Sequence, residues 1–338
     1  MTIPVIAFFN NKGGVGKTSL VYHLGWMFEQ LGVTVLAADL DPQANLTAAC
    51  LDDEKMIELI EGSPAQTVFA FIRPLIQRTG DVQAPALVPL GENERYFLLP
   101  GDLRLSEFEQ QLSDEWANTR NGDIGALRLT SALWRMLQIG AKQVQAAVIL
   151  VDMGPNLGAI NRTLLISSDH IVVPLAPDLF SLLGLQNLGK TLARWRTDWR
   201  DALKRSAEHS DLDFALPEGN MQPIGYIVVQ HAERENRPVR AYQHWISQIP
   251  GIYRKSVLNA EEVATTELDH DQNRLGLVRH YHNLMAMAQE ARKPIFALKP
   301  ADGAVAGHVK IVKTAYKNFQ ELALTIADRI GVSIPVAD

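Results

Sequence analysis

The chain has 338 residues, of which 47% are hydrophobic, and a formal net charge of −6. This composition is typical of a globular protein and argues against intrinsic disorder. A single cysteine excludes a disulfide framework within the chain, and no apolar run approaches the ~20 residues of a membrane helix. The first apolar run begins directly after Met1 and leaves no room for a signal peptide, so we expect a cytoplasmic protein.

The N-terminal segment has the pattern of a strand, a glycine-rich turn and a helix. Residues 3–9 form an apolar run, and the apolar periodicity of residues 20–31 predicts a helix. Between them lies NNKGGVGKTS, residues 10–19. Glycines leave backbone N–H groups free to surround an anion, and a helix N-terminus adds donors and a positive dipole. The segment therefore predicts a phosphate loop, with Lys17 reaching the phosphates and the Thr18 hydroxyl ligating Mg²⁺.

Three aspartates follow two further apolar runs. Asp39 and Asp41 come after residues 33–38, and Asp152 comes after residues 146–151. Because alternate residues of an extended segment share one side, Asp39 and Asp41 should both face the phosphates. Asp152 is placed to hold Mg²⁺ through water.

Apolar runs and helical patterns alternate along the rest of the chain. Strand-like runs lie at residues 33–38, 96–99, 146–151, 170–175 and 224–229. Helical patterns lie at about residues 104–114, 124–143, 157–167, 178–205 and 236–248. The alternation predicts an α/β fold, a doubly wound and mostly parallel sheet with helices on both faces and ligands at the carboxyl ends of the strands.

The length suits one large α/β domain or two small ones, and the chain has no internal repeat. We expect a single domain over residues 1–338. Three segments are predicted to be surface excursions, at residues 79–95, 200–222 and 256–275. The last has little periodicity and is predicted to be a solvated loop, because it carries Glu261, Glu262, Glu267, Asp269 and Asp271.

The phosphate loop departs from the general pattern. Asn11 stands where that pattern has a glycine, and Lys12 adds a second lysine. With KGGVGKT at residues 12–18, the chain resembles the ParA/MinD family of ATPases, which have a deviant phosphate loop. The resemblance implies that ATP is bound, with Mg²⁺, by Lys12, Gly13, Gly14, Val15, Gly16, Lys17, Thr18 and Ser19. It also implies a homodimer in the ATP state, in which Lys12 reaches the phosphates held by the other subunit.

Both switches of that family have counterparts here. DLDPQANLT at residues 39–47 is similar to switch I, and VDMGPNLG at residues 151–158 is similar to the magnesium strand and switch II. This likeness implies that Asp41 positions the attacking water and that Asp39 supports the metal shell. Gly154 replaces the first proline of the usual D-x-P-P pattern, which predicts a more mobile switch II.

The resemblance covers most of the chain. Residues 97–101 and 169–185 also match the family, and residues 288–296 match weakly. Phosphoryl transfer depends on positioning and charge neutralisation, so Lys17, Lys12 and Mg²⁺ should carry the reaction together with Asp41. We expect slow turnover, because a switch must persist long enough to be read.

Charge is distributed unevenly along the chain. Residues 41–125 hold 15 acidic and 6 basic side chains, whereas residues 271–338 hold 9 basic and 6 acidic ones. Basic stripes are predicted on two helices, formed by Arg196, Arg200 and Lys204 and by Lys310, Lys313 and Lys317, the second opposite an apolar face of Ile311, Ala315, Phe319 and Leu322. A solvated face is the simpler interpretation. The resemblance to the ParA branch implies non-specific DNA binding through such residues.

The DNA-partition branch is the first choice within the family. A membrane switch should end in a basic amphipathic helix, but this chain ends in GVSIPVAD, so we expect no membrane partner. A nitrogenase-type reductase needs more cysteines, and a tyrosine-kinase relative needs a tyrosine-rich tail. The partition reading implies a protein partner that stimulates the ATPase, and association with the nucleoid. The alternative is a regulatory or defence-system ATPase that acts through a protein partner without binding DNA.

Weaker patterns do not change this interpretation. Residues 269–273 imitate the start of an EF-hand loop, but Arg274 and His280 occupy the sixth and twelfth positions, so we reject calcium. His280 and His282 lack a third metal ligand. Trp195 and Trp199 lie one helical turn apart and are predicted to be packing residues.

Overall fold

In the described part of the chain, eight strands form one sheet at the centre of the molecule. The computed structural model describes residues 2–91, 93–208, 212–230, 239–261, 267–279, 281, 283–303 and 308–335. The strands are β1 (Val5–Phe8), β2 (Val35–Asp39), β3 (Val88–Leu90), β4 (Tyr96–Leu99), β5 (Val148–Asp152), β6 (His170–Leu175), β7 (Gln222–Gln230) and β8 (Arg274–Arg279). Their order in the sheet is β3-β4-β2-β5-β1-β6-β7-β8, and only β3 runs antiparallel to its neighbour.

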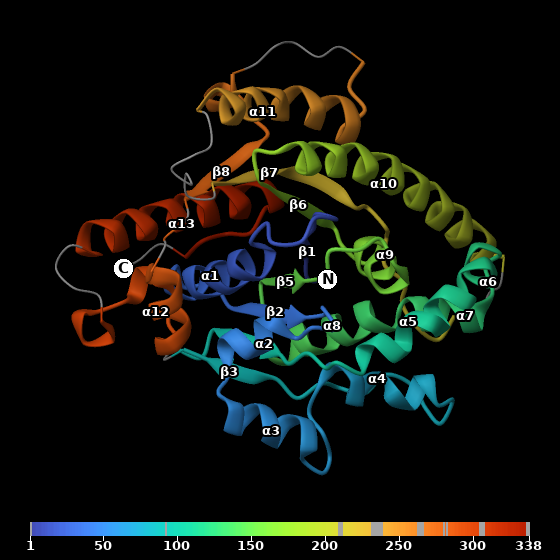
Figure 1. Cartoon of the computed structure of the whole chain (residues 1–338). Helices are drawn as coiled ribbons and strands as arrows, with labels where there is room; N and C mark the ends of the chain where they lie inside the picture. Colours follow the sequence, from blue (N-terminus) through green and yellow to red (C-terminus); the bar gives the residue numbers. More distant parts are fainter. Residues whose placement is uncertain are drawn as a thin grey trace.

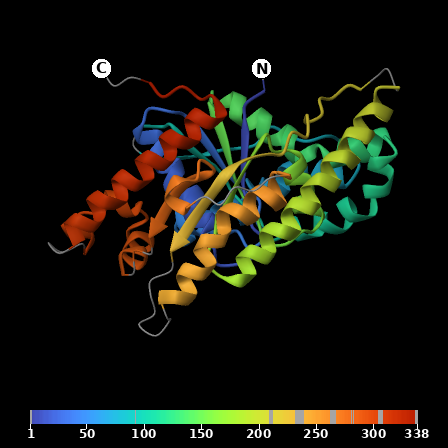
Figure 2. The same cartoon turned by 90° about the horizontal axis from the view of Figure 1, so that it is seen from above.

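Helices cover both faces of this sheet. They are α1 (Lys17–Gln30), α2 (Asn45–Cys50), α3 (Asp53–Glu61), α4 (Val68–Ile76), α5 (Leu105–Asp114), α6 (Trp116–Arg120), α7 (Ile124–Thr130), α8 (Ala132–Gln143), α9 (Ala159–Ile166), α10 (Leu179–Ser206), α11 (Val239–Ile252), α12 (Asn283–Ala291) and α13 (Val309–Ile330). In Figure 1, α1, α12 and α13 lie to the left of the sheet and α5, α7 and α9 to its right. Figure 2 shows α13 and α10 on opposite sides of the strands.

The two-residue period of the strands divides the core into two clusters. Val5 and Ala7 of β1 face a core that α8, α9 and α10 help to build. Ile6 and Phe8 face the other core, which contains side chains of α1 and α13. Because parallel strands are covered on both faces, they read as continuous apolar runs, and such runs were visible in the sequence.

The predicted fold class is confirmed by this architecture. The runs at residues 96–99 and 170–175 coincide with β4 and β6, and the other predicted strands overlap β1, β2, β5 and β7. The predicted helix at residues 124–143 is two helices, α7 and α8, which meet at Ser131. The pattern at 236–248 corresponds to α11, although residues 236–238 lie outside the described part of the chain.

Two strands, β3 and β8, were not predicted. β3 lies within a segment that was expected to be a surface excursion, and β8 begins within another. Val88–Leu90 within residues 79–95 forms the edge strand β3. Arg274, in the supposed loop 256–275, opens β8, which pairs with β7. The solvated-loop prediction is wrong for Asp271, which is 5% exposed and accepts hydrogen bonds from Tyr226 and Arg254. Glu262 lies outside the described residues.

A cluster of polar and aromatic side chains holds two of the expected excursions, residues 79–95 and 200–222, against the rest of the protein. Asp81 forms ion pairs with Arg128 of α7 and Arg135 of α8. Both guanidinium groups lie over the ring of Phe214, at 4.4 and 5.2 Å from its centroid. Segments 79–95 and 200–222 are therefore joined through one pair of arginines, each of which serves as ion-pair and stacking partner.

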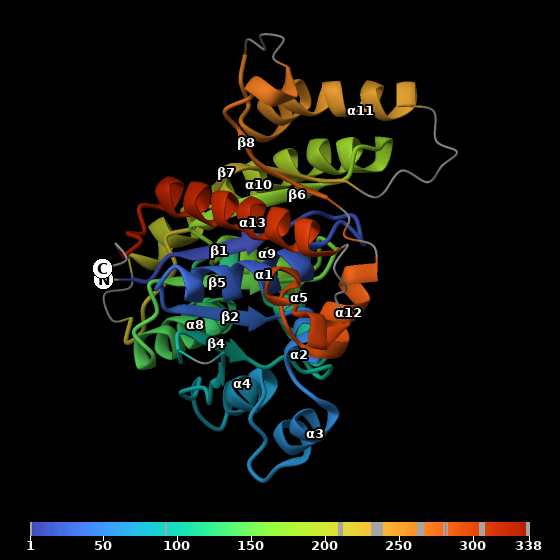
Figure 3. The ribbon, with the colours of Figure 1, turned by 90° about the vertical axis from the view of Figure 1, so that its left-hand side faces the viewer.

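The carboxyl ends of the central strands gather at one edge of the sheet. In Figure 3 the arrows of β1 and β2 point to the same side of the molecule, and α2 and α12 lie at that side; β5, between these two strands, is parallel to both. This edge carries the segments that the sequence analysis singled out, because each follows one of these strands directly.

Candidate functional site

The glycine-rich segment forms a loop between β1 and α1. Gly14 and Gly16 have φ angles of 72° and 79°, in the left-handed region that other residues adopt only at a cost. Gly16 is also the N-cap residue of α1, and no side chain caps the helix. The first N–H groups of α1 are therefore available to an anion, as a phosphate loop requires.

Lys17 lies inside this loop. It is 7% exposed, and its Nζ lies 3.3 Å from the carbonyl oxygens of Asn10 and Lys12. Burial lowers the pKa of Lys17, and the nearby carboxylates of Asp152 and Asp41 oppose that shift. The ammonium is thus held among oxygen atoms at the centre of the predicted phosphate site.

The side chain of Lys12 has a different partner from that of Lys17. Its ammonium forms an ion pair with Asp178, which also accepts a hydrogen bond from the backbone N–H of Ser181 and so caps α10. The side chains of Lys12 and Asp178 are 30% and 22% exposed. The second lysine is therefore accessible and is held by its own chain.

Asp39 and Asp152 stand side by side at the ends of β2 and β5. They are direct partners in the sheet register, and both are fully buried. Burial raises the pKa of each; repulsion from Asp39 adds to the rise for Asp152, and repulsion from Asp41 adds to the rise for Asp39. One oxygen of Asp39 and both oxygens of Asp152 have no hydrogen-bond partner within the described part of the chain.

These unpaired oxygens are suited to a cation. Buried acceptors without donors are costly, and a divalent ion bound by oxygen ligands would satisfy them. Among the described residues, no three His, Cys, Asp or Glu side chains converge as a complete metal site.

Switch I has two further anchors. The second oxygen of Asp39 accepts from both the backbone N–H and the hydroxyl of Thr47, each at 2.7 Å. Asp41, 8% exposed, accepts from the backbone N–H of Gln43. Ala44, the N-cap of α2, has a left-handed φ of 51°, an uncommon conformation for alanine that this tight turn imposes.

The turn of switch II is held by a side chain from the following helix. Asn161 of α9 donates hydrogen bonds to the carbonyl oxygens of Gly154 and Asn156. The greater mobility expected from Gly154 in place of proline stays a prediction. Asn161 is 2% exposed. The sequence analysis did not single out this residue, because its role appears only when α9 folds back over the turn.

A cavity of about 670 Å³ extends from the phosphate loop to α2 and α12. It is lined by Gly13, Gly14, Gly16, Lys17, Thr18, Ser19, Tyr22, His23, Asp41, Gln43, Asn45, Ala48, Ala49, Pro155, Met285, Ala288 and Gln289. The sequence analysis found the loop and switch residues but not Tyr22, His23 or Met285, because the helical periodicity around them resembles that of any packed helix. Ala288 and Gln289 belong to the segment 288–296, which matched the family only weakly and was assigned no role in the site.

His23 connects the loop helix to the C-terminal part of the chain. Its Nδ1 lies 2.7 Å from the carbonyl oxygen of Ser19, and its Nε2 accepts from the backbone N–H of Ile295. Its ring stacks on Phe319 of α13 at 4.8 Å. Burial lowers the pKa of His23 to about 4, so the ring is neutral at physiological pH.

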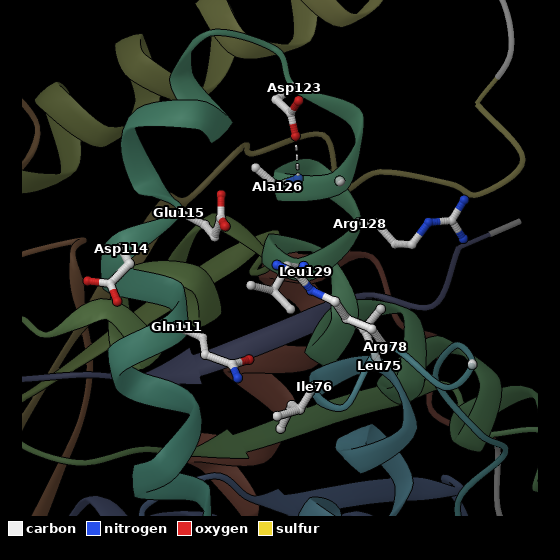
Figure 4. A pocket seen from close by; sticks show the side chains of 12 residues that line it. Leu75, Ile76, Arg78, Gln111, Asp114, Glu115, Asp123, Ala126, Arg128 and Leu129 are labelled. Carbon is white, nitrogen blue, oxygen red and sulfur yellow. Dashed lines mark hydrogen bonds between the residues drawn. The ribbon is translucent and has the colours of Figure 1, made fainter.

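A second cavity, of about 620 Å³, lies between α4, α5 and α7 (Figure 4). Its charged lining is largely engaged in structural contacts. Asp123 caps α7 by accepting from the backbone N–H of Ala126, and Arg128 points away from Asp114 and Glu115 toward its own ion pairs. The cavity at the phosphate loop is therefore the stronger candidate for function.

The weaker sequence candidates have structural roles where they are described. Trp195 and Trp199 are buried, as predicted. Asp269 pairs with Arg274, so the EF-hand-like segment is engaged within the chain. His280 and His282 lie outside the described residues.

The two basic stripes differ. Lys310, Lys313 and Lys317 are all exposed along α13. Ala315, Phe319 and Leu322 are buried as predicted, but Ile311 is 42% exposed, because this end of the helix extends past the core.

The stripe on α10 is less free than its sequence suggests. Arg196 donates to the carbonyl oxygens of Asn220 and Met221, so it ties α10 to the segment before β7. Arg200 and Lys204 remain exposed, and Lys204 lies 4.0 Å from Asp201.

A phosphate loop with a second lysine, on this strand order and with carboxylates at the ends of β2 and β5, defines a class of nucleotide-binding protein. Comparison with known families agrees. Residues 3–205 match the AAA_31 family, described as an AAA domain. The chain belongs to this family, which places it among the ParA-like members of the ParA/MinD group.

Several curated proteins are similar in sequence. The virulence plasmid ParA family protein pGP5-D of Chlamydia psittaci is 30% identical over 191 residues, which cover 55% of this chain and 62% of that protein. The sporulation initiation inhibitor protein Soj of Bacillus subtilis is 27% identical over 188 residues, covering 56% and 64%. The match thus spans less than two thirds of each of these relatives.

Solved structures share the fold over nearly the whole chain. Protein DIP2308 from Corynebacterium diphtheriae superposes with a TM-score of 0.70 at 22% identity, covering 97% of this chain and 99% of that one. The structure of pNOB8 ParA bound to nonspecific DNA has a TM-score of 0.56 at 18% identity, with coverage of 97% and 99%. At these identities the likeness establishes the fold. In the described residues, no helix is both long and apolar enough to cross a membrane.

Proposed function

We propose that this protein is an Mg²⁺- and ATP-dependent dimerising switch that hydrolyses ATP slowly, most closely a partition or positioning ATPase of the ParA type. The observation that carries the proposal is the edge of the sheet where Lys17 of the glycine-rich loop lies near Asp152 and Asp41, with Asp39 beside Asp152 in the sheet register. Buried carboxylate oxygens without donors, beside a buried lysine and an uncapped helix, fit a phosphate with its metal ion.

Each residue of the site has a distinct proposed role. Backbone N–H groups of residues 13–19 and the ammonium of Lys17 bind the phosphates. Thr18, Asp39 and Asp152 would hold Mg²⁺, which would neutralise charge on the phosphates when bound. Asp41 lies in the same cavity as Lys17 and would orient the attacking water. Tyr22 and the α12 residues Met285 and Gln289 line the far end of that cavity and would contact the rest of the nucleotide.

Dimerisation is proposed from Lys12. A self-contained phosphate loop needs one lysine, and Lys17 already fills that position. Lys12 stands at the accessible front of the loop, where its contact is an ion pair with Asp178. Exchange of that partner for the phosphates of a second subunit would make the ATP state a dimer.

Non-specific DNA binding is proposed for this dimer. Lys310, Lys313 and Lys317 are exposed along one helix, and dimerisation would double the stripe. A structural neighbour, pNOB8 ParA, is described as bound to nonspecific DNA. Contact with phosphates alone would make the affinity independent of sequence and steeply dependent on salt.

The alternative is a regulatory or defence-system switch that acts on a protein partner. The net charge of −6 and the engagement of Arg196 with the chain's own carbonyl groups favour it over DNA. In both readings a partner protein would stimulate hydrolysis, and the protein would act in the cytoplasm, on the nucleoid if it binds DNA.

Two measurements, made one after the other, test the proposal. Lys17→Ala should weaken ATP binding severely in calorimetry, and unchanged affinity would remove the phosphate-site assignment. Asp41→Ala with ATP should then shift double-stranded DNA at low salt but not at moderate salt. Charge reversal at 310, 313 and 317 should abolish that shift, whereas reversal at 200 and 204 should weaken it less. No shift at low salt would favour the protein-partner alternative.

A further inference from the structure

The turn of switch II is fixed by one buried side chain. Asn161 is 2% exposed, and its Nδ2 donates to the carbonyl oxygens of Gly154 at 2.9 Å and of Asn156 at 2.7 Å. Both acceptors are backbone groups of the turn between β5 and α9. An amide carries two N–H donors on one nitrogen, so a single asparagine can bind two carbonyl groups at once.

The helix that carries Asn161 is itself anchored. Glu109 of α5 accepts from the backbone N–H groups of Ala159 and Ile160, the first two residues of α9. This carboxylate satisfies donors that have no partner within the helix and complements the positive end of its dipole. The position of Asn161 is therefore set by α5 and α9, not by the turn that it holds.

The turn lies between the loop and the proposed water-positioning carboxylate. A Cβ atom added at Gly154 would lie 3.4 Å from an oxygen of Asp41, so the backbone there lies next to that side chain. A Cβ atom added at Gly13 would lie 3.9 Å from Pro155. Residue 154 is thus a neighbour of Asp41, and residue 155 is a neighbour of the phosphate loop.

We propose that Asn161 is a positioning residue for ATP hydrolysis. It holds the backbone of Gly154 against Asp41 and thereby fixes the carboxylate that orients the attacking water. Asn161 touches neither the phosphate loop nor Asp41 through a hydrogen bond in the described structure, and it acts through the turn alone. This inference rests on the proposed function, because it assumes that the chain hydrolyses ATP.

The restraint from Asn161 matters in this chain because residue 154 is glycine. A proline there would restrict the turn covalently, whereas glycine leaves its backbone dihedral angles free. The hydrogen bonds from Asn161 supply the missing restraint from outside the turn. Loss of these bonds should affect a step that depends on the geometry of Asp41 and leave phosphate binding by the loop largely intact.

The test compares three variants in ATP binding and turnover. Asn161→Asp keeps the shape of the side chain and removes both donors, and Asn161→Ala removes the donors without adding charge. Asn118→Asp is the matched control, because Asn118 of α6 is exposed and, among the described residues, its side chain donates only to Glu115. ATP affinity is measured by calorimetry, turnover by phosphate release, and folding by thermal unfolding.

Both Asn161 variants should lower kcat about 10- to 100-fold, as sub-ångström to ångström misplacement of a catalytic group does. The ATP dissociation constant should stay within about twofold, and the control should resemble the wild type. Hydrogen exchange at residues 156–158 should quicken in the same two variants.

Two results would overturn the inference. One is an unchanged kcat in a folded Asn161→Ala or Asn161→Asp protein. The other is a parallel fall of kcat and ATP affinity, which would indicate general loss of structure. If Asn161→Asp does not fold, the alanine variant decides. A wild-type chain that binds ATP and does not hydrolyse it would contradict the ATPase activity itself, and that outcome is recognised before any variant is measured.

Discussion

Lys12 and Lys17 belong to one loop but occupy different environments. Lys17 is buried among backbone oxygens, whereas Lys12 is partly exposed and paired with Asp178. For Lys12 to reach phosphates across an interface, this ion pair has to break. An ion pair of such exposure contributes about 0.5–1 kcal/mol, so Asp178 should oppose dimerisation only modestly.

Asp178→Asn tests this competition. The asparagine keeps an oxygen for the cap of α10 but cannot pair with an ammonium group. Each of the two subunits would otherwise break one such ion pair, so the concentration at which the ATP-bound protein dimerises should fall by about 5- to 30-fold, as measured by light scattering over a dilution series. Asp123→Asn, which alters the cap of α7 in the same way and involves no lysine, should leave it unchanged. An unchanged or weaker dimer in Asp178→Asn would contradict the competition.

Substitutions of the two switch I carboxylates, Asp39 and Asp41, should have different effects on ATP turnover. Asp41 lies in the cavity beside the loop, while Asp39 is fully buried and bound to Thr47. Asp41→Ala should bind Mg²⁺·ATP and hydrolyse it at least ~10²-fold more slowly in a phosphate-release assay, a typical loss for a positioned proton-transfer or water-orienting group. If Asp41→Ala turned over normally and Asp39→Ala did not, the two roles would be reversed.

At the scale of elements, the strands that the sequence predicted are those buried on both faces. Residues 96–99 and 170–175 form continuous apolar runs and coincide with β4 and β6. The edge strands β3 and β8 were missed because one contains a proline among only three residues and the other begins and ends with arginine. Their pairing depends on neighbours in the sheet and not on their own pattern.

The candidate site likewise contains residues that the sequence analysis predicted and residues that it missed. The loop and the carboxylates that follow β2 and β5 were predicted, because each lies directly after a strand and carries its own motif. Asn161, Glu109 and the α12 residues of the cavity were not, because they reach the site from helices far away in sequence. Arg196 shows the opposite error, since a helical stripe of charge does not reveal that a nearby backbone segment uses one of its members.

The junction of β7, β8 and residues 253–257 contains a buried carboxylate that should control local stability. Burial raises the pKa of Asp271, but hydrogen bonds from Arg254 and Tyr226 outweigh that effect and leave the pKa below its usual value. Asp271→Asn should therefore lower the free energy of unfolding by about 1.5–3 kcal/mol at pH 7.

The pH dependence of the free energy of unfolding tests the sign of the contribution from Asp271. Because the folded pKa is depressed, the stabilisation is fully present above the unfolded pKa of about 3.9 and is lost as the pH falls through the folded value. Denaturant unfolding of wild type and Asp271→Asn should converge as the pH drops below about 4. Asp269→Asn, at an exposed ion pair, should change stability by less than about 0.5 kcal/mol throughout. A difference that persists unchanged at low pH would contradict the assignment.

At the scale of the whole molecule, the proposed nucleotide site and the exposed lysines lie on elements that share one face of the sheet. The phosphate loop, the switches and Lys12 lie at the carboxyl edge, while the exposed lysines lie along α13 on one face. His23 contacts both, through the carbonyl oxygen of Ser19 in α1 and the ring of Phe319 in α13. The nucleotide helix and the lysine-bearing helix are therefore packed together.

The mass of Asp41→Ala in the presence of Mg²⁺ and ATP tests the central claim most directly. Slow hydrolysis in this variant should preserve the ATP state, and multi-angle light scattering should give twice the 37.5 kDa of the monomer. Adding Lys12→Ala should return the protein to a monomer while ATP binding is retained. A monomer for Asp41→Ala at saturating ATP, or a dimer that Lys12→Ala leaves intact, would contradict an ATP-dependent dimer built on Lys12.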